Sequence, residues 1–223
     1  EPWFSLPGIP GYNCVGRIIQ CGRNVTDYNE GDIVITCCPH TQYVKVNTKT
    51  DFCIKVKEGI DLKYATFVRM GSIAITSLRV SNIELGDFVC VIGLGIVGNL
   101  AAQFAKLQGG NVIGADLDEK RLILAEKCGV KSTRLFNTSI QDEVMQSTEV
   151  MKSSMEARFN TLIDASGSSQ AIINSLPLVA KNGEVILLGT PRNKHTADVT
   201  QLLRSIHMDN RNITFKGANE WTY

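Results

Sequence analysis

The sequence has no long apolar run and no excess of charge of either sign, and both absences exclude classes of protein. No apolar stretch approaches the ~20 residues that a membrane-spanning helix needs. The 23 basic and 22 acidic residues leave a formal charge of +1, without the basic surface that binds nucleic acid or anionic lipid. We therefore expect neither a membrane nor a nucleic acid as a partner.

A secretion signal and the cysteine spacing of a zinc site are also lacking. Residues 1–4 form neither a basic nor an apolar region, and the chain has no initiator Met, so we expect a piece of a longer protein. The seven scattered cysteines favour a reducing compartment over a disulfide framework. Cys37-Cys38 with His40 suggests a metal, but vicinal cysteines bind one ion awkwardly and no Cys-x-x-Cys completes a tetrahedral site. These features predict a cytoplasmic protein without a structural zinc.

The first part of the chain consists of short apolar runs between turn residues. Strands are expected at residues 15–19, 33–35, 43–46 and 54–56. Residues 62–79 then follow a helical pattern without proline. This organisation predicts a small β domain with a hinge helix over residues 1–78.

The second part, residues 79–223, alternates strand-like runs with helical segments, which is typical of a parallel sheet covered by helices on both faces. Six strands are expected, at residues 88–92, 111–115, 132–136, 161–165, 184–188 and 213–216. The helices between them are expected at residues 97–107, 119–127, 140–155, 169–179 and 197–207. The prediction is an α/β fold with a six-stranded, doubly wound parallel sheet.

A glycine-rich turn lies between the first of these strands and the first helix. Gly93 permits a tight turn, Gly95 lets the backbone approach a pyrophosphate, and Gly98 lets the helix pack closely on the strand. A diphosphate would then lie at a helix N-terminus, where free N–H groups and the macrodipole favour negative charge. The predicted phosphate loop of this Rossmann domain consists of Gly93, Leu94, Gly95, Ile96, Val97 and Gly98.

An acidic residue ends the next strand, about twenty residues further on, where dinucleotide-binding domains place the acceptor for the adenosine ribose. Asp116 occupies this position, and its carboxylate would repel the extra phosphate of NADP, so NAD is the favoured cofactor. Arg121 could instead accommodate that phosphate, pair with Asp118 or cover the adenine. The structural alternative is that the glycines serve packing alone and that Asp116 caps the helix beginning near Glu119.

Two later strand ends carry small residues that leave room for a cofactor. Ser166-Gly167 and Gly189-Thr190 follow the fourth and fifth expected strands. Because ligands bind at the carboxyl ends of parallel strands, we expect both pairs to contribute to the same site. Ordinary turn chemistry is the alternative explanation.

With Leu85-Gly86-Asp87 and the glycine motif in this order, the chain resembles the medium-chain dehydrogenase/reductase superfamily, the group of zinc alcohol and polyol dehydrogenases and quinone reductases. The run from Gly16 through Gly22 to Gly31-Asp32-Ile33-Val34 is similar to the one that leads the family's GroES-like catalytic domain. The resemblance implies a Rossmann domain at residues 79–223, an incomplete GroES-like domain at residues 1–78, and a homodimer.

The resemblance fails where zinc-dependent members bind their catalytic metal. Those members carry Gly-His-Glu-x-x-Gly, whereas residues 11–16 place Tyr12 and Asn13 at the two central positions. Their third ligand, a Cys or an acid, falls near Arg69, whose guanidinium would repel Zn²⁺. The interval between Cys38 and Tyr43 is too short for the four-cysteine lobe that holds a structural zinc. The resemblance therefore implies a zinc-free branch with no metal ligand.

Without zinc, other groups must stabilise charge on the substrate oxygen and transfer a proton. The candidate catalytic residues are Tyr12, His40 and Arg69. Each also has a structural explanation: Tyr12 as a packed tyrosine, His40 as a surface-loop histidine, and Arg69 as the partner of an acid across the domain boundary.

The resulting expectation is an NAD(H)-dependent oxidoreductase that interconverts a small secondary alcohol and the matching ketone. One alternative is an enoyl or quinone reductase that uses NADPH, although that branch usually has a different glycine loop. Another is a nucleotide-binding protein without turnover, because fold alone does not establish chemistry. Binding of NADH without its consumption over many alcohols, ketones and enones would favour this second alternative.

Overall fold

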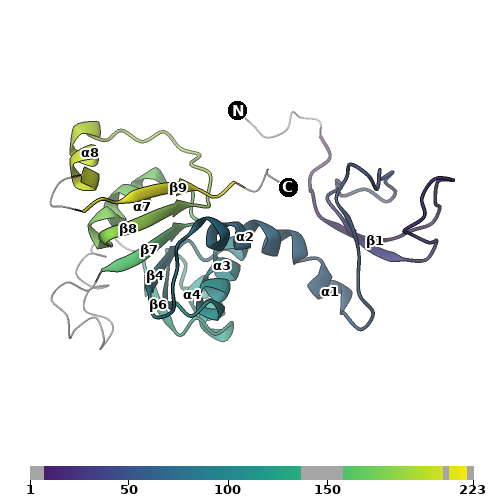
Figure 1. The fold of residues 1–223 in the computed structure, drawn as a ribbon, viewed down its shortest axis with the longest axis horizontal. Coiled ribbons are helices and arrows are strands. Elements are labelled where there is room, and N and C mark those ends of the chain that lie inside the picture. The colour runs from purple at the N-terminus through teal and green to yellow at the C-terminus, as the bar shows by residue number, and fades with distance from the viewer. Residues whose placement is uncertain (1–7, 137–157, 208–210, 220–223) are drawn as a thin grey trace. The chain divides into compact units, whose positions relative to one another are not determined.

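The computed structural model describes residues 8–136, 158–207 and 211–219 (Figure 1). The chain divides into two compact units, Glu1–Arg69 and Met70–Tyr223. The division falls in the first turn of helix α2 (Val68–Val80), whereas the sequence suggested a boundary between residues 78 and 79. Each unit has a sheet of its own.

The first unit contains a three-stranded antiparallel sheet in the order β1 (Cys14–Arg17), β2 (Ile33–Thr36), β3 (Cys53–Lys55). The central strand is the most buried, because both of its edges are paired. Residues 43–46, which the structure describes, form no strand, so that expectation was wrong. Tyr43 and Val44 are both exposed, and a strand without one buried face has no packing to stabilise it.

The helical stretch expected at residues 62–79 is split into α1 (Leu62–Ala65) and α2. Asp61 begins α1 because its carboxylate accepts a hydrogen bond from the Lys63 N–H at 2.8 Å. The Thr66 hydroxyl donates to the Lys63 carbonyl at 2.6 Å, and such local side-chain bonds compete with the helical ladder. The helix therefore breaks at Thr66, whose hydroxyl takes up a backbone carbonyl of the preceding turn.

The second unit contains a six-stranded parallel sheet in the order β6-β5-β4-β7-β8-β9. The sequence order reverses between β4 and β7, so the sheet is doubly wound and the predicted fold is confirmed. The strands are β4 (Phe88–Ile92), β5 (Asn111–Asp116), β6 (Ser132–Leu135), β7 (Phe159–Asp164), β8 (Val179–Leu187) and β9 (Thr214–Gly217).

The expected strands agree with these bounds to within two residues except at β8, which begins at residue 179 rather than 184. The register between β7 and β8 shifts there, and Asn182 has a φ of 59° in the left-handed region. β8 therefore continues across Asn182-Gly183, a pair of residues that normally marks a turn, while its register with β7 jumps from Val179 to Glu184.

Helices flank the sheet of the second unit (Figure 1). They are α3 (Ile96–Leu107), α4 (Glu119–Lys127), α7 (Ser169–Ser175) and α8 (Val199–His207). α7 ends four residues before the expected position because Pro177 lies in the 3₁₀ turn Leu176–Leu178 that follows it. The helix expected at residues 140–155 lies outside the described residues. Among the described helices, none combines the length and apolar character that crossing a membrane requires.

The core of the second unit lies on both faces of the central strands. Val89 and Val91 of β4 belong to one apolar cluster, while Cys90 and Ile92 belong to the other. Strands that are buried on both faces have continuous apolar sequences, and the apolar sequence of β4 therefore predicted its position correctly. The tightly packed sheet provides a rigid base for the loops at its carboxyl edge.

Candidate dinucleotide-binding site

Three loops meet at the carboxyl edge of the sheet in the second unit, after β4, β7 and β8. The Ala165 N–H donates to the carbonyl of Ile92, the last residue of β4, at 2.8 Å. The Gly189 N–H donates to the carbonyl of Asp164, the last residue of β7, at 2.7 Å. The structure therefore brings the predicted glycine loop, Ser166-Gly167 and Gly189-Thr190 together at the edge where open α/β sheets bind ligands.

Backbone approaches between these loops leave no space for side chains. A β-carbon at Gly93, whose φ is +89°, would lie 2.7 Å from the Ser166 nitrogen. A β-carbon at Gly189 would lie 2.6 Å from the Gly167 nitrogen. Glycine is therefore required at Gly93 both for its conformation and for the contact with the loop after β7.

Helix α3 begins at this junction without a side-chain cap. Its N-cap residue is Gly95, whereas Asp61, Asp118 and Ser168 cap α1, α4 and α7 with side-chain oxygens. A β-carbon at Gly95 would have no atom within 4 Å, so there is open space beside the N-cap residue. First-turn N–H groups lack intrahelical acceptors, and together with the dipole they can bind a phosphate.

The other members of the glycine loop anchor it or line it. Gly98 is buried, and a β-carbon there would collide with the Gly93 carbonyl oxygen and lie 2.9 Å from the Ala165 β-carbon. Leu94 is 1% exposed and packs over Gly114, where a β-carbon would lie 2.9 Å from Leu94 Cδ1. Leu94 is thus an anchor in the core, whereas Ile96 is exposed at the helix start.

Asp116 lies beside the glycine loop at the end of β5. Its Oδ2 accepts a hydrogen bond from the Leu94 N–H at 2.6 Å, and its Oδ1 accepts one from the Asp118 N–H at 2.9 Å. The Arg121 guanidinium lies 3.4 Å from Oδ2. The N-cap of α4 is Asp118, so Asp116 is not the cap of that helix, and Arg121 pairs with Asp116 rather than Asp118.

The site contains one carboxylate that the sequence did not single out. Asp164 is fully buried, and its oxygens accept hydrogen bonds from the loop after β7. Burial raises the pKa of this carboxyl, and the hydrogen bonds from Ser166 and Gly167 oppose that shift. The signal was an Asp at a strand end followed by Ala-Ser-Gly, which is typical of a side-chain-stabilised turn.

The three candidate catalytic residues belong to the first unit. Tyr12 is 55% exposed, so it is not a packed core tyrosine. His40 is exposed, and its ring lies against Gly11, where a β-carbon would collide with the imidazole. Arg69 is 7% exposed in the first turn of α2. None of these observations assigns a catalytic role.

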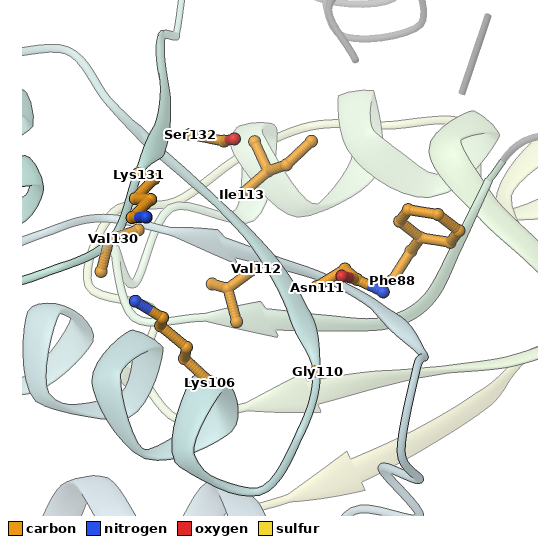
Figure 2. A pocket seen from close by; sticks show the side chains of 9 residues that line it. All are labelled: Phe88, Lys106, Gly110, Asn111, Val112, Ile113, Val130, Lys131 and Ser132. Atoms are coloured by element: carbon orange, nitrogen blue, oxygen red, sulfur yellow. The ribbon is translucent and has the colours of Figure 1, made fainter. Parts of the chain in front are cut away.

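A cavity of about 240 Å³ lies at the opposite edge of the sheet, where β5 and β6 begin. Figure 2 shows Val112 in its wall and the ammonium groups of Lys106 and Lys131 at one side. Lys106 donates to the Gly129 carbonyl at 2.6 Å. Because parallel sheets bind ligands at the carboxyl ends of their strands, we do not take this cavity as the cofactor site.

Comparison with known proteins establishes the family. A family model described as zinc-binding dehydrogenase matches residues 97–221, which is more than half of the chain. The chain belongs to this family, the zinc-type medium-chain alcohol dehydrogenases, and the predicted resemblance is confirmed. The matched residues include Val97, Gly98 and Asp116, but neither the first four residues of the glycine loop nor Tyr12, Asn13 and Arg69.

Individual relatives agree with this assignment. The chain is 30% identical over 211 residues to D-guloside 3-dehydrogenase from Shigella flexneri, which covers 93% of the chain and 58% of that protein. A zinc-dependent alcohol dehydrogenase 2 from Streptococcus pneumonia superposes with a TM-score of 0.76 at 19% identity, over 97% of this chain and 68% of that one. A structure of a zinc-binding dehydrogenase from Sinorhizobium meliloti, solved bound to NADP, superposes with a TM-score of 0.72 at 20% identity. The match covers 91% of this chain and 66% of that one. The chain thus spans about three fifths of the length of the curated relatives it matches.

The side chains in the candidate zinc positions do not fit a tetrahedral zinc site. Asn13 donates its amide to the Thr66 carbonyl, and its Oδ1 is buried without a hydrogen-bond partner. Tyr12 is exposed, and neither a tyrosine nor the guanidinium of Arg69 is a usual zinc ligand. Among the residues that the structure describes, no three His, Cys, Asp or Glu side chains are grouped as ligands. We therefore derive no chemistry through zinc.

Proposed function

We propose that the protein is an NAD(H)-dependent oxidoreductase that interconverts a secondary alcohol of a sugar or polyol with the matching ketone, without catalytic zinc. The observation that carries this proposal is the N-terminus of α3, which has no side-chain cap and has open space beside its N-cap residue Gly95. The Asp116 carboxylate is bonded to the same glycine loop. The family contains a D-guloside 3-dehydrogenase, and this supports a carbohydrate alcohol as the substrate class.

The chain's own residues would bind and orient the cofactor. The N–H groups at the start of α3 would hold the diphosphate, and Asp116 would accept hydrogen bonds from the adenosine ribose. Ser166, Gly167, Gly189 and Thr190 would line the path of the nicotinamide half. When bound, the cofactor supplies or accepts the hydride. Tyr12, His40 and Arg69 remain our candidates for contacting the substrate oxygen and transferring its proton.

The preference for NAD over NADP depends on the balance between Asp116 and Arg121. A buried carboxylate with two backbone donors stays at the end of β5, where it would repel a 2′-phosphate. Arg121 is half exposed and weakly paired at 3.4 Å, so it could turn toward such a phosphate, and one structural relative was solved with NADP. Preference for NADP is therefore the second candidate.

Cofactor titration followed by turnover tests the proposal. We expect NADH to quench the protein's tryptophan fluorescence with a lower Kd than NADPH, and we expect NADH formation with a panel of sugars, glycosides and polyols. Binding without turnover over alcohols, ketones and enones would instead indicate a nucleotide-binding protein. Absence of binding to either cofactor would overturn the assignment of the site.

We also propose a cytoplasmic location and a homodimer. All seven cysteines are free thiols, which suits a reducing compartment. The family resemblance supports the dimer. Light scattering of the purified protein tests the assembly, and a monomer at micromolar concentration would contradict it.

A further inference from the structure

Asp164 is a buried carboxylate for which the proposed cofactor contacts provide no role. It ends β7 and is 0% exposed, so its side chain is not available to a ligand in the site. Removing a carboxylate from water is unfavourable unless hydrogen bonds compensate for the lost hydration. The hydrogen-bond partners of the buried carboxylate should therefore show why Asp164 lies at the edge of this site.

The hydrogen bonds that the structure describes to the Asp164 carboxylate come from the loop that follows it. Oδ1 accepts from the Ser166 hydroxyl at 2.5 Å and from the Ser166 N–H at 3.1 Å. Oδ2 accepts from the Gly167 N–H at 3.2 Å. The Ser166 oxygen in turn accepts from the Ser168 N–H at 3.1 Å. The carboxylate therefore determines the conformation of residues 165–168.

This loop lies between the two other loops of the site. The Ser166 backbone lies so close to Gly93 that no β-carbon fits between them, and the same holds for Gly167 and Gly189. Gly167 has a φ of +66° and also lies against the Thr190 carbonyl. A displacement of Ser166 would therefore be passed to the glycine loop, and one of Gly167 to the loop after β8, because packed backbones cannot absorb it.

We propose that Asp164 is a positioning residue of the cofactor site, whose carboxylate holds residues 165–168 against the glycine loop and the loop after β8. This inference rests on the proposed dinucleotide binding. Asp164 acts through the backbone of the three loops and touches no cofactor atom.

A positioning role and a purely structural role lead to different effects on stability. Burial raises the pKa of Asp164, so the ionised form is less favourable in the folded protein than in the unfolded chain. Asparagine has nearly the same shape and no charge. It keeps an acceptor for Ser166 but presents an amide donor to the Gly167 N–H. Asp164→Asn removes the buried charge and the Gly167 hydrogen bond together, so we expect the loop to be displaced while the two effects on stability offset each other.

The experiment compares Asp164→Asn with a matched buried carboxylate in the next strand. Glu184 of β8 is 5% exposed and accepts from the Asn82 N–H at 2.7 Å, and it pairs with Lys216 at 2.6 Å. We expect Asp164→Asn to raise the Kd for NADH about tenfold or more, because a hydrogen bond to a charged acceptor is lost, at an unchanged or higher melting temperature. Glu184→Gln should lower the melting temperature and leave the Kd unchanged, because it leaves Lys216 without its partner.

The outcomes separate this inference from the proposed function. Failure of the wild type to bind NADH or NADPH would overturn the proposed function. Wild-type binding with an equal Kd in Asp164→Asn would overturn the positioning role alone. If that variant does not fold, Ser166→Ala decides, since it removes one donor and keeps the buried charge. We expect weaker NADH binding in Ser166→Ala, and an unchanged Kd there would overturn the inference.

Discussion

The backbone N–H of Leu94 donates a hydrogen bond to Oδ2 of Asp116 across 2.6 Å. This bond joins the glycine loop after β4 to the end of β5. Asp116 Oδ1 accepts the Asp118 N–H at 2.9 Å, so the carboxylate is held from two sides. The residue that we expect to receive the ribose hydroxyls therefore also sets the position of the phosphate loop.

Replacing Asp116 by Ser should change the choice between cofactors. We expect the Kd for NADH to rise more than the Kd for NADPH, because the variant loses both the ribose acceptor and the repulsion of the 2′-phosphate. Binding of both should weaken, since the Leu94 N–H loses its acceptor. Titrations of the wild type and the variant with both cofactors measure this ratio. Asp118→Ser, which keeps a helix cap, is the control and should leave the ratio unchanged. Tighter binding of NADPH by the wild type would refute the prediction.

Two glycines of one motif should behave differently when replaced by valine. Gly95→Val places its side chain in open space before the terminus of α3, so we expect loss of NADH binding with a nearly unchanged melting temperature. Gly98→Val drives a side chain into the Gly93 carbonyl and Ala165, so it should lower stability by roughly 1–3 kcal/mol or more and also weaken binding. Thermal melts and NADH titrations distinguish the two effects. Undiminished NADH affinity in Gly95→Val would falsify the assignment of the phosphate loop.

The stability of the protein should depend on pH through Asp164. Its pKa in the folded protein is raised above 3.8, so the folded state binds this proton more tightly than the unfolded chain. The contribution of Asp164 is most favourable below 3.8, and it falls as the pH rises through the raised pKa. Asp164→Asn lacks this dependence. Urea unfolding at several pH values should show the stability difference, variant minus wild type, increasing with pH and then levelling off. A constant difference would contradict the raised pKa.

Metal removal should leave the protein unchanged. By the family resemblance, we expect Tyr12 and Asn13 to stand where zinc-dependent members carry a metal-binding motif, and we expect Arg69 to bring a positive charge near the third ligand position. We expect substoichiometric zinc in protein purified without chelator, and we expect the same melting temperature and NADH affinity after dialysis against EDTA. One zinc per chain would show that Cys37, Cys38 and His40 take part in a site that we rejected.

The sequence alone determined the fold class and which strand-end loops we propose for the cofactor. Buried parallel strands need continuous apolar runs, and a backbone that approaches a phosphate needs Gly93, Gly95 and Gly98 at fixed spacing. Such requirements concern residues that are close together in the sequence, so the sequence alone shows them. Strand positions were correct to within a few residues for β4, β5 and β6, because each is bounded by its own turn residues.

Only the tertiary structure decided which groups meet. The contacts of Gly93 with Ser166 and of Gly189 with Gly167 join residues far apart in the chain, and they depend on the strand order at the sheet edge. The failure of residues 43–46 to form a strand has the same origin, since an apolar run becomes a strand only where a neighbour pairs and buries it. The role of Asp164 likewise depends on burial, because a carboxylate in a sequence shows neither its hydration nor the backbone that surrounds it.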